Sequence, residues 1–202
     1  PDHLTVSERT KAALIEAHNK GIKIAIATGR ALNFTKNVTD QIPFVDYVIC
    51  SNGASVYDRT NKTFIYTNLV SPEITAEAVE LLKTLPVYYN IYMDGKIYAE
   101  EGTEKYFQNT GLPAGFIEEF ASRLTTCKDM SETVKGKGAE LIDVFFGTEE
   151  LKKTIYDFFE SKGLVLASAL VGVVSATAVG SDKGTALDGL CKAIGSIDDE
   201  AM

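Results

Sequence analysis

The sequence predicts an α/β fold with a parallel sheet that is interrupted by an inserted α+β domain. Helix and strand patterns alternate over residues 6–51 with short connections, which is typical of a parallel α/β sheet. Hairpin signals and amphipathic helices then occupy residues 70–178, and a final helix pattern returns the chain to the first domain. We therefore expect residues 1–69 and 179–202 to form the α/β core and residues 70–178 to form the insertion.

The alternating part opens with a helix that is predicted over about residues 6–20. Thr5 and Glu8 fit a capping box, in which Thr5 caps the helix start and Glu8 occupies its third position. Gly21 follows, and glycine is common just beyond a helix end. The side chains that this helix is expected to bury are Ala13, Leu14 and Ala17.

Two almost wholly apolar segments, residues 22–27 and 47–51, are predicted to be buried strands, with a weaker helix at about 31–40 between them. Such runs are typical of strands covered on both faces of a parallel sheet. No strand pattern precedes the helix at 6–20, although such sheets are built from strand–helix–strand crossovers. We therefore expect the sheet to be incomplete in this chain, with its open position beside residues 22–27.

An antiparallel hairpin and a capped helix are predicted to follow. Residues 55–58 and 63–67 fit the two strands of the hairpin on either side of a polar turn. Ser71 and Pro72 then fit the N-cap and the first position of a helix. The apolar side chains that this helix is expected to bury are Ile74, Ala78, Leu81, Leu82 and Leu85.

A second hairpin is predicted at residues 90–93 and 96–99, because Asp94-Gly95 between them strongly indicates a two-residue loop. The polar stretch 101–138 is expected to hold short helices and loops. Four tyrosines around this hairpin are interpreted mainly as packing residues, with a substrate cage as the alternative: Tyr88, Tyr89, Tyr92 and Tyr98.

In the rest of the insertion, the sequence predicts a strand at 140–146, a helix at 148–162 and one or two buried strands within 164–179. Thr148 is predicted to cap the helix, and Ser181 is predicted to cap the last helix of the chain. The first of these helices is expected to bury Leu151, Ile155, Phe158 and Phe159. The second carries Leu187, Leu190 and Ile194.

The composition excludes some classes of protein. The chain has 20 basic and 28 acidic residues and a formal net charge of −8, which argues against nucleic acid as its main partner. No apolar run reaches the roughly 18 residues that a membrane span needs. Three widely spaced cysteines without a CxxC indicate reduced thiols, and only two histidines occur, which argues against a His-based zinc site. We expect a cytoplasmic protein without a membrane partner. The sequence does not indicate which oligomeric state the protein adopts.

Thr28-Gly29-Arg30 lies at the carboxyl end of the predicted strand 22–27, where open α/β sheets bind ligands. A threonine hydroxyl and backbone N–H groups at such a position can hold a phosphate, and glycine lets the backbone approach it closely. The alternative is an ordinary strand-to-helix turn in which the glycine serves only the geometry.

Lys183 and the pair Asn52-Gly53 are the other candidate site residues. Lys183 falls in the first turn of the last helix, where a positive side chain is unusual unless it serves an anion. Asn52-Gly53 follows the predicted strand 47–51, and the Asn52 amide could donate a hydrogen bond to a substrate oxygen. Asp182 is interpreted as an ordinary first-turn acid. The alternatives are a solvated surface lysine and a plain Asn-Gly turn.

The combination of these motifs is more specific than any one of them. Ile-Ala-Thr-Gly-Arg at residues 26–30, Ile-Cys-Ser-Asn-Gly-Ala at 49–54, a long α+β insertion, and Asp-Lys-Gly-Thr-Ala-Leu at 182–187 follow one another in this order. This arrangement resembles the Cof-type branch, subfamily IIB, of the haloacid dehalogenase superfamily. The resemblance covers the chain from end to end.

The resemblance implies a Rossmann-like core with a C2B-type cap at residues 70–178. It also implies Mg²⁺-dependent hydrolysis of small phosphorylated metabolites, such as sugar phosphates, through an aspartyl-phosphate intermediate. By motif match, Thr28 would bind the transferring phosphoryl group, and Lys183 would stabilise its charge and orient the nucleophile. The residues that would line the phosphate and substrate site are Gly29, Arg30, Asn52 and Gly53.

Two motifs that this resemblance leads us to expect are absent: DxDGT, with the nucleophilic and acid/base aspartates, and GDxxND, with metal ligands. Asp198 and Asp199 lack the glycine and asparagine of the second motif and are not predicted to bind metal. We therefore expect the nucleophile and the Mg²⁺ ligands to lie outside this sequence. The alternative is a catalytically inactive fragment, or a phosphate-binding or interaction module of the same fold. A nucleotide-binding Rossmann protein is disfavoured because GxGxxG and GxxxxGK[ST] do not occur.

Overall fold

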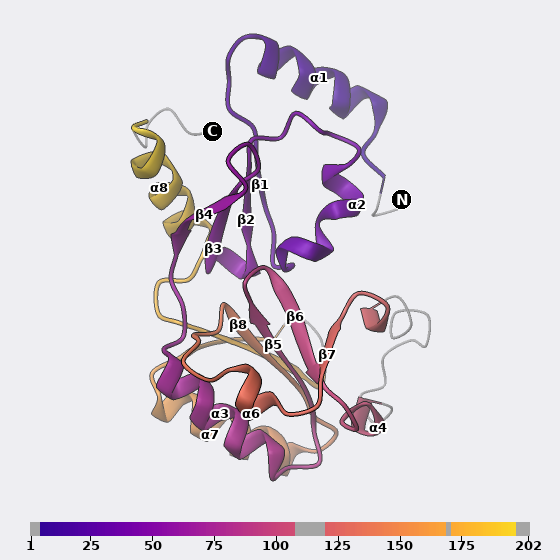
Figure 1. The fold of residues 1–202 in the computed structure, drawn as a ribbon, viewed down its shortest axis with the longest axis vertical. Coiled ribbons are helices and arrows are strands. Elements are labelled where there is room, and N and C mark those ends of the chain that lie inside the picture. The colour runs from indigo at the N-terminus through magenta and orange to yellow at the C-terminus, as the bar shows by residue number, and fades with distance from the viewer. Residues whose placement is uncertain (1–4, 108–119, 169–170, 197–202) are drawn as a thin grey trace. The chain divides into compact units, whose positions relative to one another are not determined.

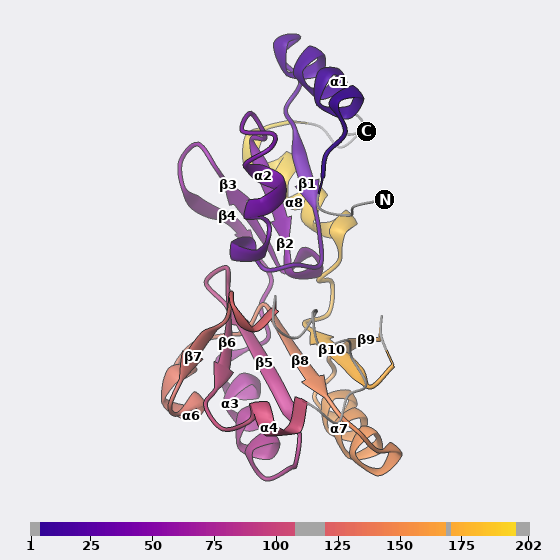
Figure 2. The same ribbon diagram turned by 90° about the vertical axis from the view of Figure 1, so that its right-hand side faces the viewer.

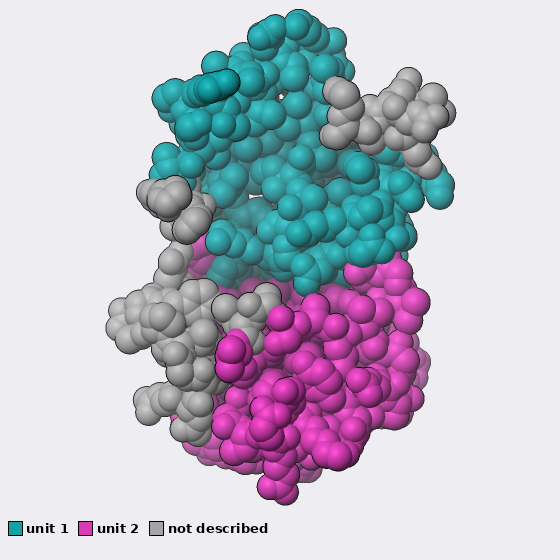
Figure 3. Space-filling model, turned by 180° about the vertical axis from the view of Figure 1, so that it is seen from behind, with its two compact units in different colours: residues 1–67, 182–202 teal, residues 68–181 magenta. Residues whose placement is uncertain are grey.

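The computed structural model describes residues 5–107, 120–168 and 171–196 (Figure 1). Two compact units make up the chain, and Figure 3 colours them separately. Residues 1–67 and 182–202 form the first unit, and residues 68–181 form the second. In the described ranges, no helix has the length and apolar character that a membrane span requires.

The first unit is an α/β unit with one four-stranded sheet. Its elements are α1 (Glu8–Asn19), β1 (Ala25–Ala27), η1 (Leu32–Phe34), α2 (Lys36–Thr39), β2 (Tyr47–Cys50), η2 (Ser51–Gly53), β3 (Ser55–Asp58), β4 (Thr63–Thr67) and α8 (Lys183–Ile194). The strand order is β1-β2-β3-β4, in which β1 and β2 are parallel and β2, β3 and β4 are antiparallel neighbours. The predicted α/β class, the parallel pairing of the first two strands and the hairpin after them are confirmed.

β1 is shorter and more exposed than predicted. Ala25 and Ala27 are exposed and Ile26 is only partly buried, so the prediction of a strand over 22–27 that is buried on both faces is wrong. β1 lies at the edge of the sheet and has β2 as its one described neighbour, which explains the exposure. β2 is buried along its whole length, as predicted, and its Cys50 lies in an apolar cluster.

α1 begins at Glu8, and its N-cap is Ser7 rather than the predicted Thr5. The Ser7 Oγ accepts a hydrogen bond from the Thr10 N–H at 3.2 Å. The predicted capping box is therefore wrong by two positions, because a second hydroxyl residue stands closer to the helix and satisfies its first N–H groups.

The packing of the helices in the first unit also differs from the prediction. No described residue of α1 is fully buried: Ala13 is exposed, while Leu14 and Ala17 are partly buried against the apolar cluster under β1 and β2. The helix predicted at 31–40 is instead two short pieces, η1 and α2. The core of the first unit consists of two apolar clusters that share β2: one includes Ile24, Ile42 and Val45, and the other includes side chains of β3 and α8.

The second unit is an α+β unit, as predicted for the insertion. Its elements are α3 (Pro72–Lys83), β5 (Tyr88–Met93), β6 (Lys96–Glu100), α4 (Glu104–Phe107), β7 (Thr125–Cys127), α6 (Met130–Thr133), β8 (Leu141–Phe145), α7 (Glu149–Ser161), β9 (Val165–Ala167) and β10 (Val173–Thr177). The six-stranded sheet has the order β7-β6-β5-β8-β10-β9, and only its β6–β7 pair is parallel among the described strands. The predicted polar stretch 101–138 lies partly outside the described residues.

Helices α3 and α7 cover one face of this sheet, where the main apolar core lies (Figure 2). Leu82 of α3 and Phe159 of α7 are almost completely buried there, together with inward side chains of β5, β8 and β10. Each such side chain stabilises the fold by about 1.5–3 kcal/mol relative to an exposed position. The predictions of a helix at about residues 148–162 and of the burial of its Phe159 are confirmed.

Three local sequence signals in the second unit are confirmed. Ser71 caps α3 by accepting a hydrogen bond from the Ile74 N–H at 3.3 Å, and Thr148 caps α7 in the same way at 3.3 Å. Asp94 and Gly95 form the β5–β6 loop with φ of +52° and +70°, the left-handed pair that a two-residue hairpin loop requires.

The face of the sheet opposite α3 and α7 bears a buried carboxyl group, Asp143 of β8. Its side chain accepts hydrogen bonds from the Tyr92 hydroxyl at 2.7 Å and from the Ser175 hydroxyl. Burial raises the pKa of Asp143 above its ordinary value of 3.8, and the two hydrogen bonds offset only part of this rise. The buried position therefore favours the protonated form.

We expect Asp143 to make the stability of the protein depend on pH. A carboxyl group whose pKa is higher in the folded chain stabilises the fold below the unfolded value, and this contribution is lost as the pH rises through the folded value. The free energy of unfolding should therefore contain a falling component above pH 3.8, up to the raised pKa. Asp143→Asn stays neutral and should remove it, as measured by chemical denaturation from about pH 3 to 8.

The matched control is Asp40→Asn, at the exposed C-terminal end of α2. It should keep the pH profile of the unchanged protein. A profile of Asp143→Asn that is as steep as the profile of Asp40→Asn would contradict the assignment.

Candidate functional site

Three separate segments meet at the carboxyl ends of β1 and β2 in the first unit. They are the loop after β1, the η2 turn after β2 and the start of α8. Because the carboxyl ends of neighbouring parallel strands share one edge of the sheet, residues that follow them are close in space. The segments that meet here contain all the residues predicted for the site, namely Thr28, Gly29, Arg30, Asn52, Gly53 and Lys183.

Backbone hydrogen bonds hold the loop after β1 to the end of β2 and to the η2 turn. The Thr28 N–H donates to the Ile49 carbonyl at 2.9 Å, the Asn52 N–H donates to the Thr28 carbonyl at 3.2 Å, and the Ser51 N–H donates to the Arg30 carbonyl at 3.0 Å. The Thr28 Oγ1 also accepts from the Arg30 N–H at 3.2 Å. Since the oxygen acts as an acceptor here, the hydroxyl proton of Thr28 can still be donated to a ligand.

Two glycines allow the three segments to approach one another. A Cβ on Gly29 would lie 2.6 Å from the Asn52 Oδ1, so any other residue at this position would displace that amide. Gly53 has a φ of +102°, and a Cβ on it would lie 2.2 Å from the Asp182 carbonyl oxygen and 2.9 Å from the Lys183 nitrogen. The η2 turn therefore touches the backbone at the start of α8.

The η2 turn itself has an unusual backbone. Ser51 and Asn52 have φ of +50° and +58°, the left-handed region that costs a residue other than glycine about 1 kcal/mol or more. Asparagine tolerates this region better than most residues. Local strain of this kind is frequent where a side chain or backbone group must be held for a ligand.

The start of α8 is capped by Asp182, so the prediction that Ser181 is the N-cap is wrong. The Asp182 carboxylate accepts hydrogen bonds from the Thr185 N–H at 2.9 Å and from the Thr185 hydroxyl at 2.7 Å. These bonds, the backbone N–H of Thr185 first, lower the pKa of Asp182. Ser181 instead donates its hydroxyl to the Asn68 carbonyl at 2.9 Å, within the second unit.

This cap changes how α8 can serve an anion. Because Asp182 uses N–H groups of the first turn and adds a negative charge, the helix start is a weaker anion site than a free helix start would be. The exposed Lys183 side chain must then supply the attraction. In the parts of the chain that the structure describes, no hydrogen bond or ion pair holds its Nζ.

The described residues do not fit a Mg²⁺ site. Among them, no group of three or more His, Cys, Asp and Glu side chains is placed to hold a metal ion. Asp182 is a carboxylate close to the candidate site, but its oxygens are committed to capping α8. Asp198 and Asp199 lie outside the described residues.

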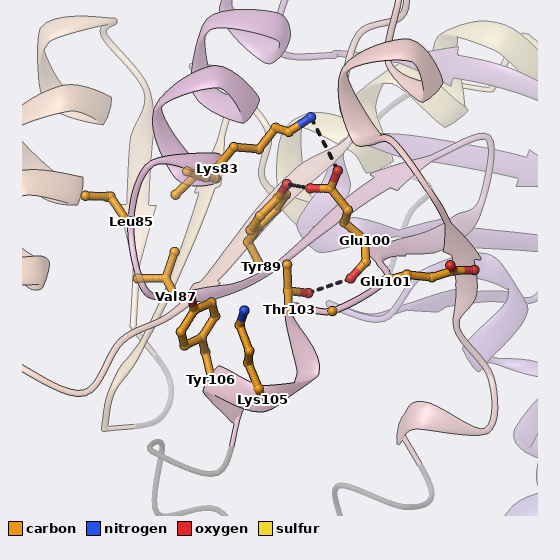
Figure 4. Close-up of a pocket in the computed structure, with 11 residues that line it drawn as sticks. Lys83, Leu85, Val87, Tyr89, Glu100, Glu101, Thr103, Lys105 and Tyr106 are labelled. Carbon is orange, nitrogen blue, oxygen red and sulfur yellow. Dashed lines mark hydrogen bonds and ion pairs between the residues drawn. The ribbon is translucent and has the colours of Figure 1, made fainter.

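A pocket of about 240 Å³ in the second unit contains none of the predicted site residues (Figure 4). The Glu100 carboxylate in its wall accepts hydrogen bonds from the Tyr89 hydroxyl and the Met130 N–H, and Lys83 lies 3.4 Å from it. The Lys83 ammonium also donates to Asp129, and this bond is the main cause that raises the pKa of Lys83. These polar groups satisfy one another, so the network stabilises the junction of α3, β6 and α6.

Fold and site together define an α/β protein whose candidate ligand site lies at the carboxyl edge of a sheet. The sequence model of one family, described as haloacid dehalogenase-like hydrolase, matches residues 1–202. The chain therefore belongs to the haloacid dehalogenase-like hydrolases. The resemblance seen in the motifs is confirmed.

A sequence relative from Buchnera aphidicola subsp. Baizongia pistaciae is provisionally named a phosphatase. It is 35% identical over 150 residues, which cover 74% of this chain and 52% of the relative. A relative from Mycoplasma pneumoniae with the same provisional name is 28% identical over 116 residues, which cover 57% of this chain and 39% of the relative. The chain thus spans about half the length, or less, of these relatives.

Solved structures share the fold over almost the whole chain. A protein from Thermotoga maritima has a TM-score of 0.77 and 22% identity, covering 98% of this chain and 72% of its own. A haloacid dehalogenase-like hydrolase from B. subtilis has a TM-score of 0.74 and 17% identity, covering 96% and 74%. A subclass IIB sugar phosphatase has a TM-score of 0.67 and 22% identity, covering 96% and 71%.

Proposed function

We propose that this chain is part of a Mg²⁺-dependent phosphomonoester hydrolase that acts on small phosphorylated metabolites such as sugar phosphates. The observation that carries the proposal is the meeting of Thr28, the Asn52-Gly53 turn and Lys183 at one edge of the sheet. Membership of a hydrolase family, relatives provisionally named phosphatases and a sugar phosphatase of the same fold support it.

Each residue of the site has a role that its chemistry allows. The Thr28 hydroxyl donates to a phosphoryl oxygen, and the exposed Lys183 ammonium offsets the negative charge. Asn52 offers an amide to the substrate, Gly29 and Gly53 let the backbone approach closely, and Arg30 lies beside the phosphate. Phosphoryl transfer depends mainly on such positioning and charge stabilisation.

The nucleophilic aspartate and the Mg²⁺ ligands would lie outside these 202 residues. The aspartate that would form the aspartyl-phosphate intermediate belongs to a motif that this sequence lacks. The Mg²⁺ ligands are assigned outside as well, because the described carboxylates do not fit the ion. We also propose a cytoplasmic location, with neither nucleic acid nor membrane as a partner, on the basis of the net charge of −8 and the lack of long apolar runs.

A second candidate is a phosphate-binding or interaction module of the same fold that does not turn over substrate. The lack of a metal-binding group among the described residues favours it. In this case Thr28 and Lys183 would hold an anion without hydrolysis.

The test uses the full-length protein that contains this chain. Hydrolysis of p-nitrophenyl phosphate and of a panel of sugar phosphates would be measured with Mg²⁺ and with excess EDTA, and inorganic phosphate binding would be followed by ³¹P NMR. Turnover that requires Mg²⁺ is the expected result. Phosphate binding without turnover would replace the proposal with the second candidate, and the lack of both would overturn the two together.

A further inference from the structure

A carboxylate stands at the start of α8, directly before the lysine of the candidate site. Asp182 precedes Lys183 in the chain, and its carbonyl oxygen lies so close to Gly53 of the η2 turn that a Cβ there would approach it within 2.2 Å. The Asn52 amide of the same turn lies against Gly29 in the loop after β1. The η2 turn thus contacts both that loop and the start of α8, so Asp182 borders the proposed phosphate site.

The Asp182 side chain is held in one position. Its Oδ1 accepts a hydrogen bond from the Thr185 N–H at 2.9 Å, and its Oδ2 accepts one from the Thr185 hydroxyl at 2.7 Å. A Cβ on Gly184 would lie 3.1 Å from the Asp182 Oδ1, so glycine leaves room for the carboxylate to fold over the first turn. Both oxygens are therefore fixed by one residue of the helix.

The negative charge of this carboxylate stays present and unpaired. The hydrogen bonds from Thr185, the backbone N–H first, lower the pKa of Asp182 below its ordinary value of 3.8, so the group is ionised at neutral pH. Among the described residues, no Lys or Arg forms an ion pair with it. A fixed, unpaired negative charge repels an anion that binds beside it.

Capping alone does not require this charge. Asparagine and serine cap helices about as well as aspartate does, and both are neutral. A phosphatase must also release inorganic phosphate after each turnover. Lys183, the Thr28 hydroxyl and nearby backbone N–H groups would all slow that release, whereas the charge of Asp182 opposes them.

We propose that Asp182 weakens the binding of inorganic phosphate at the site of Thr28 and Lys183 and thereby promotes the release of the product. The inference rests on the proposed function, because it assumes that this site binds phosphate. It adds to that function a residue that sets how tightly the product is held.

Asp182→Asn in the full-length protein tests the inference, because asparagine keeps the cap and removes the charge. Inorganic phosphate binding is titrated by ³¹P NMR at about 0.02 M and about 0.5 M salt, which screen charges weakly and strongly. We expect Asp182→Asn to bind phosphate about two- to fivefold more tightly at low salt, and the difference to shrink at high salt. The inhibition constant of phosphate against p-nitrophenyl phosphate hydrolysis should fall by a similar factor.

Asp188→Asn is the matched control, since Asp188 is an exposed aspartate further along the same helix. It removes the same charge and should leave phosphate binding unchanged. Asp182→Ala removes both the cap and the charge, so it should lower the melting temperature, whereas Asp182→Asn should hardly change it. The effect of the charge is thereby separated from the effect of the cap.

Two results would overturn the inference alone: phosphate binding by Asp182→Asn that is no tighter than binding by the unchanged protein, or an equal gain in Asp188→Asn. If neither the unchanged protein nor Asp182→Asn binds phosphate, the inference fails together with the proposed site. Since the titration needs no turnover, a protein that binds phosphate without hydrolysis still gives a decisive answer on Asp182.

Discussion

Gly53→Ala is expected to lower the free energy of unfolding by about 3–5 kcal/mol, through backbone strain and a steric clash. The residue has a φ of +102°, which a side chain tolerates poorly, and a Cβ would come within 2.2 Å of the Asp182 carbonyl oxygen. The obstacle is backbone, so relief requires α8 to move away from the η2 turn. Phosphate binding should weaken along with stability, because the same contact holds the start of α8 beside the loop of Thr28.

The control for this substitution is Gly21→Ala in the same unit. Gly21 also has a positive φ, +83°, but nothing lies within 4 Å of a Cβ placed there. Its replacement should cost only the backbone strain, about 1 kcal/mol. Urea denaturation of the two variants in parallel separates the effects, and equal losses of stability would contradict the contact between η2 and α8.

Lys183→Ala is expected to lower kcat/KM of the full-length protein about 100- to 1,000-fold, the size of effect seen when one group that stabilises transition-state charge is removed. The melting temperature should hardly change, because the side chain is exposed. Steady-state kinetics with p-nitrophenyl phosphate and a thermal melt measure the two quantities.

Lys192→Ala is the matched control, since Lys192 is an exposed lysine on the same helix, near its other end. It removes the same charge from the molecule at a position that the proposal gives no role. Lys183→Arg should restore part of the activity, because it keeps the charge with a different shape. If Lys183→Ala turns over substrate as fast as Lys192→Ala, then Lys183 is not part of the proposed site.

The features that could be predicted from the sequence are those set by nearest neighbours in the chain. Ser71 and Thr148 cap their helices because the N–H groups they satisfy lie three residues away. Asp94-Gly95 fixes its hairpin through the conformations of the two residues themselves. Such signals need no knowledge of distant segments.

Features that depend on distant contacts were predicted less well. The apolar run at 22–27 indicates a strand, but its burial depends on which strands lie beside it, and β1 has only β2. Ser181 and Asp182 are both good caps, and a contact of Ser181 with Asn68, far away in sequence, leaves Asp182 to cap α8. Local pattern alone does not decide between two adjacent capping residues.

In the candidate site, too, some features follow from the local sequence and others depend on distant contacts. The positions of Thr28 and Asn52 follow from two adjacent parallel strands, which the pattern of apolar runs indicates. The contact of Gly53 with α8 could not be foreseen, because it depends on how a distant helix packs. The buried carboxyl group of the second unit was missed as well, although Asp143 interrupts an otherwise apolar strand, and this interruption is a signal that a sequence does show.

The bonds that join Asn68 to Val179 and Ser181 have a consequence for the order in which the protein folds. The ribosome delivers the whole second unit before it delivers α8, so residues 1–67 are synthesised long before their last helix. The Asn68 amide donates to the Val179 carbonyl at 2.9 Å, and the Ser181 hydroxyl donates to the Asn68 carbonyl at 2.9 Å. A second unit that has already folded thus holds together the two segments by which the chain enters and leaves it, and α8 follows directly after the second of them. Without these bonds, bringing α8 to residues 1–67 would close a loop of more than a hundred residues. With them, the ends of that loop are already close, so the entropic cost of the closure is smaller.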